Sequence, residues 1–502
     1  MPPGPRDDAE TTVAGARRSG HGIGPRLAHA LQNRDMALAP DPSLQAASRT
    51  AGPPAAMTDW TCPFCALLCD GLSVTQAAGK APALAGDACP RATRALAAFD
   101  PQAAATGPCA DGRAVALPQA LDTAARLLAA SRRPLFGGLA TDVAGARALY
   151  ALANQCAAVL DHAHGDAMTA SLRALQDRGA FTTTLAEVRA RADLIVCIGT
   201  QPSHKHPEFF RRCGLAEAEQ ACAREIVFVG TPVDAAAAAL PDARCGAIDL
   251  PGNLDLYQAV ALLNALCRPR ALPDHGIAPA PLRALADKLR AARYAVLVWT
   301  PSTLVGLPGG KHAALLIESI HHLIKTLNRS TRAGGLSLGG DDGGNTVNQA
   351  LTWLSGLPLR TQVHRQGLDH DPHGQAGARL LRERSVDALL WVASFTPDLP
   401  PPASALPTVV LGHPALAASM ADRHGVFIPV ATPGIGAAGH LFRTDGGIVL
   451  PLRPLREDGL PTVAEVATQL LVRITRIRPA DAAAALPVPP VPPAPSSTES
   501  AS

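Results

Sequence analysis

Four cysteines near the start of the folded chain have the spacing that most clearly indicates chemistry. Cys62, Cys65 and Cys69 form a C-x2-C-x3-C pattern, and Cys89, followed by a proline, comes after a longer loop. An iron–sulfur cubane needs four thiolates that converge on one site, and short loops of this kind deliver two or three of them. Four cysteines can also bind zinc tetrahedrally, and buried cysteines can be ordinary core residues in an alanine-rich chain. We predict an iron–sulfur-type motif with these four cysteines as ligands of a [4Fe–4S] cluster.

Two segments concentrate histidine and aspartate. Residues 161–168 (DHAHGDAM) and residues 367–374 (GLDHDPHG) each hold several side chains that could bind a metal. Acidic and histidine-rich loops are more often solvated surface, because charged side chains are seldom buried. We therefore interpret both segments as polar loops, with a metal site as the alternative.

Two further segments are placed to bind a ligand at strand ends. His204, His206 and Arg211 come directly after an apolar run that ends at Thr200, and doubly wound folds bind ligands at the carboxyl ends of their strands. The glycine-rich run 334–347 (GGLSLGGDDGGNTV) could approach a phosphate with its backbone amides. It lacks the Lys-Ser/Thr pair of a P-loop and the G-x-G-x-x-G order, so it is a weak nucleotide motif.

The composition is that of a globular protein. The 502 residues carry a net charge of +3, 47% are hydrophobic and 17% are charged. A chain of this length is expected to form roughly two to four domains. The basic residues are scattered, which argues against binding to nucleic acid or to an anionic membrane surface.

The chain shows no sequence feature of export or membrane insertion. It contains no run of about twenty apolar residues, and its N-terminal segment lacks the apolar stretch of a signal peptide. We therefore expect a cytoplasmic protein. In a reducing compartment, clustered cysteines indicate metal ligands more than disulfides.

Apolar runs alternate with amphipathic segments from about residue 110 to residue 432. Continuous apolar runs predict strands that are buried on both faces, and their alternation with helices indicates parallel, doubly wound α/β domains. The predicted strands are 134–138, 193–200, 225–230, 295–300, 388–394 and 409–412, and the predicted helices are 143–158, 254–266 and 312–327. Residues 441–452 are predicted to form a hairpin with its turn at Asp445-Gly446.

These patterns suggest an order of domains along the chain. A Pro- and Arg-rich stretch at 268–283 is the predicted boundary between two α/β units. Met57 is an alternative start, because ordered sequence begins directly after it. The predicted parts are a disordered segment 1–56, an iron–sulfur-type domain 57–105, α/β domains 106–283 and 284–432, a C-terminal hairpin and helix 433–478, and a disordered tail 479–502.

The cysteine pattern and several longer stretches resemble a known family. The C-x2-C-x3-C…C-P start resembles the cluster domain of molybdopterin and tungstopterin oxidoreductases. The chain as a whole resembles the B-type subunit of formylmethanofuran dehydrogenase, from about residue 60 to residue 475. The stretches that carry this resemblance are CALLCDGL, DHAHGDAMTASLRALQDRG, VRARADLIVCIGTQPSHKHPEFFRR, NTVNQALTWLSGLPL and VFIPVATPGIGAAGHLFRTDGGIVLPL.

The resemblance implies a fold and a cofactor site. It implies a small N-terminal iron–sulfur domain, followed by doubly wound α/β domains of the molybdopterin oxidoreductase type (formate dehydrogenase/DMSO reductase, domains I–III). In this family a cysteine or selenocysteine before a His-Gly-Pro sequence holds tungsten or molybdenum. Alignment on Asp161 and on 174–176 puts Ala167 at that position, and Met168, Thr169 and Ala170 do not reproduce His-Gly-Pro. An alanine methyl group cannot donate an electron pair to a metal.

Two functions are compatible with an alanine at the position of the family's metal ligand. The chain resembles the B-type subunit of the bacterial formyltransferase/hydrolase complex, a non-redox relative, so we expect a scaffold subunit without tungsto- or molybdopterin. That complex moves a formyl group from tetrahydromethanopterin to a methanofuran-type carrier and hydrolyses it to formate. The expected partners are formyltransferase-like, amidohydrolase-like and small C-type subunits, which carry the catalysis. The alternative is an active tungsten- or molybdenum-pterin subunit; a free-standing formate dehydrogenase-like enzyme fits the matching stretches less well.

Overall fold

The computed structural model describes most of the ordered chain. The described residues are 55–77, 79–86, 89–99, 107–216, 224–241, 244–268, 278–364, 366–420 and 423–478. The predicted disorder of 1–56 and of 479–502 falls almost wholly outside these ranges. Within them, ordered structure begins slightly before Met57, because Ala55 and Ala56 already pair with Gln76 and Thr75 in a strand.

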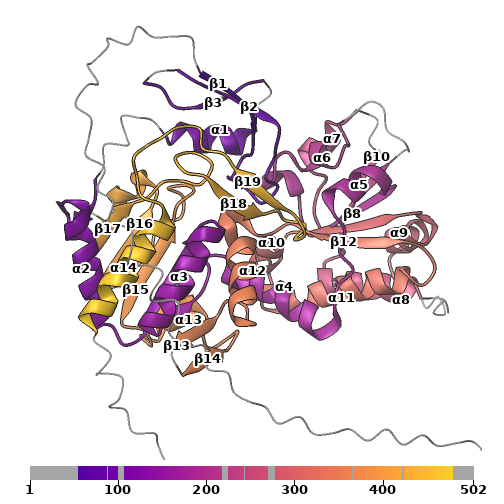
Figure 1. Ribbon diagram of the computed structural model, residues 1–502. Coiled ribbons are helices and arrows are strands. Elements are labelled where there is room, and N and C mark those ends of the chain that lie inside the picture. Colours follow the sequence, from indigo (N-terminus) through magenta and orange to yellow (C-terminus); the bar gives the residue numbers. More distant parts are fainter. Residues whose placement is uncertain are drawn as a thin grey trace, which may run out of the picture. The chain divides into compact units, whose positions relative to one another are not determined.

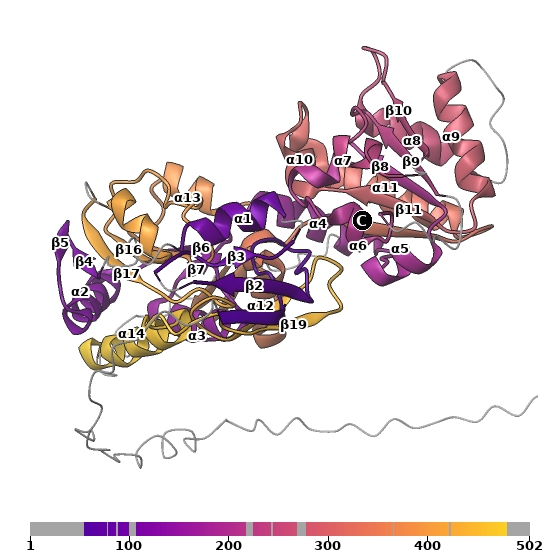
Figure 2. The ribbon, with the colours of Figure 1, turned by 90° about the horizontal axis from the view of Figure 1, so that it is seen from above.

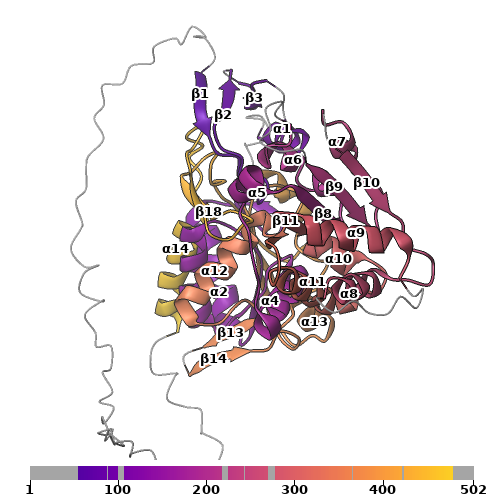
Figure 3. The same ribbon diagram turned by 90° about the vertical axis from the view of Figure 1, so that its right-hand side faces the viewer.

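The first part of the described chain is a small antiparallel sheet with one helix. Its elements are β1 (Ala55–Trp60), β2 (Leu72–Gln76), β3 (Ala83–Leu84) and α1 (Pro90–Ala97). Figures 1 and 3 show the three strands and α1 at the same end of the molecule. The Trp60 indole donates to the carbonyl of Gly434 at 2.8 Å, and the Thr444 amide donates to the carbonyl of Ala66 at 2.8 Å. These bonds tie the small sheet to the C-terminal region.

One five-stranded sheet is entirely parallel. Its order is β10-β9-β8-β11-β12, and the strands are β8 (Leu194–Ile198), β9 (Glu225–Val229), β10 (Arg244–Ile248), β11 (Ala295–Trp299) and β12 (Ala333–Ser337). The chain extends the sheet from β8 toward β10 and then returns to place β11 on the other side of β8. The strand order therefore reverses between β8 and β11.

Helices cover both faces of this sheet, and Figure 2 shows α8, α9 and α11 beside it. One face packs on α4 (Gly165–Arg178), α8 (Leu256–Leu266), α9 (Ala280–Ala291), α10 (Pro301–Gly306) and α11 (Ala313–Leu327). The other face packs on α5 (Leu185–Arg191), α6 (Phe209–Arg212), α7 (Ala235–Ala238) and the small N-terminal sheet. Strands buried on both faces explain why their sequences are continuous apolar runs.

The second sheet has nine strands. Its order is β14-β13-β7-β6-β15-β16-β17-β4-β5, with β4 (Cys109–Ala110), β5 (Arg113–Ala114), β6 (Pro134–Ala140), β7 (Val159–Leu160), β13 (Thr361–His364), β14 (Gly367–His370), β15 (Ala388–Ala393), β16 (Thr408–Gly412) and β17 (Gly425–Pro429). The five strands from β7 to β17 in this order are parallel, and antiparallel strands flank them on both sides. One face packs on α2 (Leu117–Ala130), α3 (Val143–Cys156), α12 (Gly344–Ser355) and α14 (Val463–Ile477), and the other on α13 (Gly377–Arg382).

The two sheets are interleaved along the chain, which differs from the predicted sequential domains. β6 pairs with β15, although the whole five-stranded sheet lies between them in sequence. β8 pairs with β11 across the predicted boundary at 268–283. Strand pairing of this kind depends on contacts between distant segments, which local composition does not encode. The boundary at residue 283 therefore does not separate the sheets.

The remaining predicted elements are present. The hairpin forms from β18 (Gly439–Phe442) and β19 (Val449–Leu452), and α14 follows it as the predicted C-terminal helix. Among the described residues, no helix has both the length and the apolar character needed to cross a membrane.

Candidate functional site

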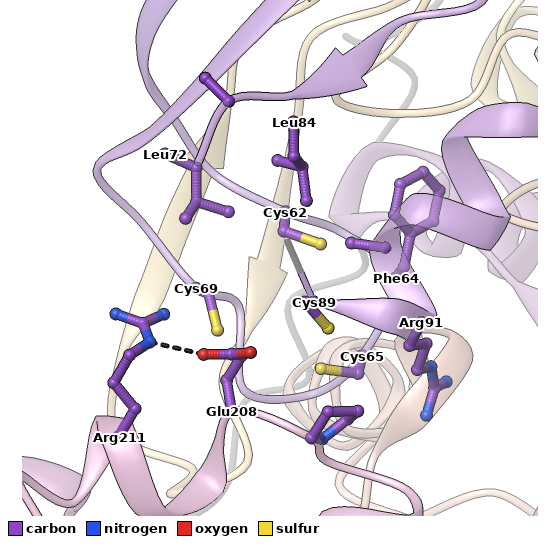
Figure 4. Close-up of a pocket in the computed structure, with 13 residues that line it drawn as sticks. Cys62, Phe64, Cys65, Cys69, Leu72, Leu84, Cys89, Arg91, Glu208 and Arg211 are labelled. Atoms are coloured by element: carbon purple, nitrogen blue, oxygen red, sulfur yellow. Dashed lines mark hydrogen bonds and ion pairs between the residues drawn. The ribbon is translucent and has the colours of Figure 1, made fainter. Parts of the chain in front are cut away.

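The four motif cysteines line one pocket next to α1. Cys62, Cys65 and Cys69 come from the loop between β1 and β2, and Cys89 directly precedes α1. The Cys62 amide donates to the carbonyl of Cys69 at 2.8 Å, so the loop folds back on itself. Figure 4 shows the four sulfur atoms turned toward the same space. The structure thus brings together all four residues that the sequence marks as one donor set.

Four thiols that line one pocket are a possible donor set for an iron–sulfur cluster or a metal ion. Burial raises the pKa of the Cys62 and Cys65 thiols well above the ordinary range and that of Cys69 to about 11. A bound metal must therefore displace these protons. Within the described ranges, no three His, Cys, Asp or Glu side chains lie close enough to hold one ion. Zinc needs all its sulfurs within about 2.3 Å of one ion, whereas each cysteine of a cubane binds its own iron.

The three residues predicted at the end of β8 lie in different places. Arg211 lines the cysteine pocket and forms an ion pair with Glu208 there, as Figure 4 shows. His204 is exposed and lines an open groove. His206 is fully buried, with its Nε2 atom 3.3 Å from the Asp341 carboxylate. The strand end therefore contributes to more than one site.

Asp341 joins the cysteine loop to the glycine-rich run. Its carboxylate accepts the amide of Ala66 at 2.9 Å and Nη1 of Arg91 at 3.1 Å, and His206 faces it. Burial opposes ionisation of this carboxyl group, but His206, Arg91 and the Ala66 amide outweigh it and hold its pKa well below the usual range. Asp341 is thus a partly buried anion at the centre of a charged cluster. The sequence did not single it out, although two aspartates within a glycine run after a strand are the available signal.

The adjacent Asp342 organises two histidines of the 161–168 segment. Its carboxylate lies 2.9 Å from Nε2 of His164, and its carbonyl lies 3.2 Å from Nε2 of His162. The hydrogen bond to Asp342 raises the pKa of His164, whereas burial lowers that of His162 to about 4. At neutral pH, His162 is therefore an uncharged core residue.

The interpretation of residues 161–168 as solvated surface is wrong for its first two residues. Asp161 and His162 are only 6% and 4% exposed. The Asp161 carboxylate accepts the Gly377 amide at 2.7 Å and Nε of the buried Arg360 at 3.3 Å. These bonds offset part of the cost of its burial, which still raises its pKa. Residues 367–374 form β14 and the turn after it, where Asp371 accepts the amide of His373.

A second cavity surrounds Ala167, with a volume of about 260 Å³. Ala167 lies in the first turns of α4, which follows β7 and packs against α10 and α11 of the other sheet. The cavity also opens at the carboxyl ends of β11 and β12, where Trp299 and Ser337 line it. This is the side of the sheet where its strand order reverses between β8 and β11, and such points are the usual ligand sites of doubly wound folds.

The glycine-rich run forms one wall of this cavity. Its first residues belong to β12, the next make a short 3-10 turn over Asp341–Gly343, and α12 begins at Gly344. Gly343 has φ +73°, and a Cβ atom there would lie 2.4 Å from the carbonyl oxygen of Thr141. Thr141 directly follows β6, so this turn packs against the carboxyl end of the second sheet as well. The run therefore lies between the two sheets.

Comparison with known proteins identifies the family. No protein-family model matches the chain. The B-type subunit of the formyltransferase/hydrolase complex (Fhc) of Methylorubrum extorquens is 30% identical over 367 residues, which are 72% of this chain and 95% of that relative. The crystal structure of FhcABCD from the same organism in complex with methylofuran contains a chain that is 29% identical with a TM-score of 0.63. The match covers 74% of this chain and 99% of that one.

The protein belongs to the family of Fhc B-type subunits. Two B-type subunits of tungsten-containing formylmethanofuran dehydrogenase 2 are also similar. The one from Methanocaldococcus jannaschii is 26% identical over 77% of this chain and 90% of the relative. The one from Methanococcus maripaludis is 24% identical over 83% and 98%. The resemblance seen in the sequence and the mixed α/β fold are thus confirmed.

The cavity of this Fhc B-type relative does not fit a pterin-bound metal. Ala167 presents only a methyl group at the position where the resemblance implies a thiolate or selenolate ligand. Within the described ranges, no cysteine lines the cavity, and the His164 imidazole is already bound to Asp342. Met168 offers a thioether, which is a weak donor. The Asp341 carboxylate also lines the cavity, but it is already held by Arg91 and the Ala66 amide, so the ligand that the resemblance implies at position 167 has no replacement there.

Proposed function

We propose that this chain is the B-type subunit of a formyltransferase/hydrolase complex. The complex moves a formyl group from tetrahydromethanopterin to a methanofuran-type carrier and hydrolyses it to formate. Support comes from the 30% identity to the Fhc B-type subunit over 95% of that relative. The FhcABCD structure with methylofuran, which contains a similar chain, suggests the same kind of partners and carrier. We expect formyltransferase-like, amidohydrolase-like and small C-type subunits beside it, in the cytoplasm.

In this complex the chain acts as a non-redox scaffold subunit. Ala167 carries this part of the proposal, because it offers no donor atom at the position where the resemblance implies the metal ligand. Formyl transfer and hydrolysis need no electron transfer, so the loss of that ligand leaves the proposed reaction intact. Catalysis then resides in the companion subunits, and this chain holds them together.

The four motif cysteines hold a structural [4Fe–4S] cluster in this proposal. They line one pocket from two separate segments, so a bound cluster would cross-link the β1–β2 loop to the start of α1. The pocket also contains the apolar side chains of Phe64, Leu72 and Leu84, which shield the thiols from water. We assign the N-terminal part as an iron–sulfur domain in front of α/β domains of the molybdopterin oxidoreductase type.

Purification of the tagged full chain from its own organism tests the assignment. We expect three companion subunits to co-purify, together with hydrolysis of formyl-tetrahydromethanopterin to formate that depends on the methanofuran-type carrier. Formate-dependent reduction of a viologen dye should be absent. A preparation that reduces the dye with formate and shows no formyl transfer contradicts the proposal.

The second candidate is an active tungsten- or molybdenum-pterin subunit. Its support is the similarity to two B-type subunits of tungsten-containing enzymes and the retention of four clustered cysteines. It requires a metal ligand other than residue 167. Stoichiometric tungsten or molybdenum in the active preparation would favour this candidate over the scaffold.

A further inference from the structure

The cavity next to Ala167 contains a buried hydrogen-bond donor that has no acceptor among the described residues. The Trp299 side chain is 1% exposed and lines the cavity, and its Nε1–H has no hydrogen-bond partner among the described residues. Asn348 also lines the cavity, and its Oδ1 already accepts the amide of Leu359 at 3.1 Å. The side-chain NH2 of Asn348 is therefore the group left to face a ligand.

The start of α12 places the positive end of a helix dipole at the same cavity. Gly343 is its N-cap and provides no side chain to bind the first amides of this twelve-residue helix. Gly344 and Asn345, the first two residues of the helix, line the cavity. The Gly344 amide already donates to the carbonyl of Asp341, so this end contributes the positive end of the helix dipole, which favours an anion.

Lys205 supplies a full positive charge at the same wall. Its Nζ atom donates to the hydroxyl of Ser302 at 2.7 Å, and no carboxylate is paired with it in the described part of the chain. The Asp341 carboxylate also lines the cavity but is paired with Arg91, and the nearby Asp342 is paired with His164. The cavity therefore has an excess of positive charge and of donors.

The opposite wall is apolar. Met168, Leu172 and Leu175 of α4 line it together with Leu338. A volume of about 260 Å³ lies just below the range of about 300–1,000 Å³ that drug-sized ligands occupy. The space suits a single ring or a short hydrocarbon body that carries one anionic group.

We propose that this cavity binds a small organic carboxylate. The carboxylate faces Lys205, the Trp299 indole and the positive end of the α12 dipole, and the hydrocarbon body packs on the leucines of α4. The site lies at the point where the strand order of the five-stranded sheet reverses, and it uses no metal. It is independent of the proposed formyl transfer, because it rests on the cavity alone.

Calorimetric titration of the full chain, with the subunits that co-purify, tests the site with three probes. Benzoate carries the charge and the ring, benzamide keeps the shape without the charge, and inorganic phosphate has the charge without the ring. We expect benzoate to bind with one site per chain, and benzamide and phosphate to bind at least about tenfold more weakly, as loss of one charge-assisted hydrogen bond predicts. Equal affinity for benzamide or phosphate overturns the proposal.

Two variants locate the binding. Lys205→Met removes the charge, and Lys311→Met, another exposed lysine outside the cavity, is its matched control. Ala167→Leu fills the cavity without a change of charge. We expect Lys205→Met and Ala167→Leu to weaken benzoate binding at least about tenfold, and Lys311→Met to leave it unchanged. Because Lys205 is exposed, its variant tests the site even if Ala167→Leu fails to fold. Unchanged benzoate affinity in Lys205→Met refutes the assignment.

Discussion

Asp341→Asn should destabilise the chain strongly although it changes almost no volume. The carboxylate accepts the Ala66 amide, pairs with Arg91 and faces the buried His206. An asparagine leaves the Arg91 guanidinium without its counter-charge in a half-buried position. Removing one partner of a buried ion pair costs about 3–5 kcal/mol. The Asp341 and Arg91 side chains keep 15% and 24% exposure, so we expect about 2–3 kcal/mol after solvent screening.

Equilibrium urea unfolding of the full chain, followed by circular dichroism, measures this cost. Asp371→Asn is the matched control, because Asp371 is an exposed aspartate that accepts the amide of His373. Its replacement should change the free energy of unfolding by no more than about 0.5–1 kcal/mol. If Asp341→Asn is as stable as this control at pH 7, the charged cluster does not hold the cysteine loop and the reasoning is refuted.

Because of the Asp341 carboxylate, we also expect the stability of the chain to depend on pH. Its pKa is depressed in the folded chain, so its contribution to stability is fully present above the unfolded pKa of about 3.9. The contribution is lost as the pH falls from there toward the folded pKa. The gap between wild type and Asp341→Asn should therefore be constant from pH 5 to pH 7 and narrow below about pH 4. A gap that narrows already between pH 7 and pH 5 contradicts the depressed pKa.

Three further predictions test other parts of the structure. Gly343→Ala should cost at least about 2 kcal/mol in unfolding free energy, because its Cβ would meet a carbonyl 2.4 Å away. Gly446→Ala, also at positive φ but with nothing within 4 Å, should cost only about 1 kcal/mol; equal losses would contradict the packing of the turn. Burial lowers the pKa of His413 to about 4, so the unfolded chain binds a proton that the folded one excludes between pH 4 and about pH 6.5. The wild-type chain should therefore lose stability between pH 7 and pH 5, and the His413→Asn variant should lose on the order of 2 kcal/mol less. An equal loss in both chains would show that His413 does not contribute. Cys65→Ala should lower the iron content and the thermal stability while formyl hydrolysis remains, with Cys197→Ala, a buried cysteine outside the pocket, as the iron control; equal iron in both variants argues against a cluster.

The strands could be predicted where burial on both faces determines their composition. β8 and β11 are runs of five buried residues, so the apolar sequences at 193–200 and 295–300 identify them. β12 was missed because its sequence, Ala-Gly-Gly-Leu-Ser, is a poor strand former. The structure explains why residue 335 is a glycine, because a Cβ atom there would lie 2.9 Å from the Trp299 ring of the neighbouring strand. That requirement comes from tertiary packing and leaves no local pattern.

The candidate site was only partly predictable, because some of its residues are close in sequence and others are brought together by the fold. Three of the four pocket cysteines lie in one loop, so their spacing alone indicates a common site. Ala167 carries no chemical signal of its own and stands out only through the resemblance. Asp341 looks like an ordinary residue of a polar glycine run, and its role depends on Arg91 and Ala66, which the fold brings to it from far away in the chain. Long-range pairing, including that of β6 with β15, is what the sequence patterns could not supply.

Elemental analysis of the native complex is the most direct test of the central claim. Inductively coupled plasma mass spectrometry on the active preparation gives tungsten, molybdenum and iron per chain in one measurement. We predict about four iron atoms per chain, as one [4Fe–4S] cluster requires, and only trace tungsten and molybdenum. Tungsten or molybdenum at one atom per chain would contradict the non-redox assignment that rests on Ala167.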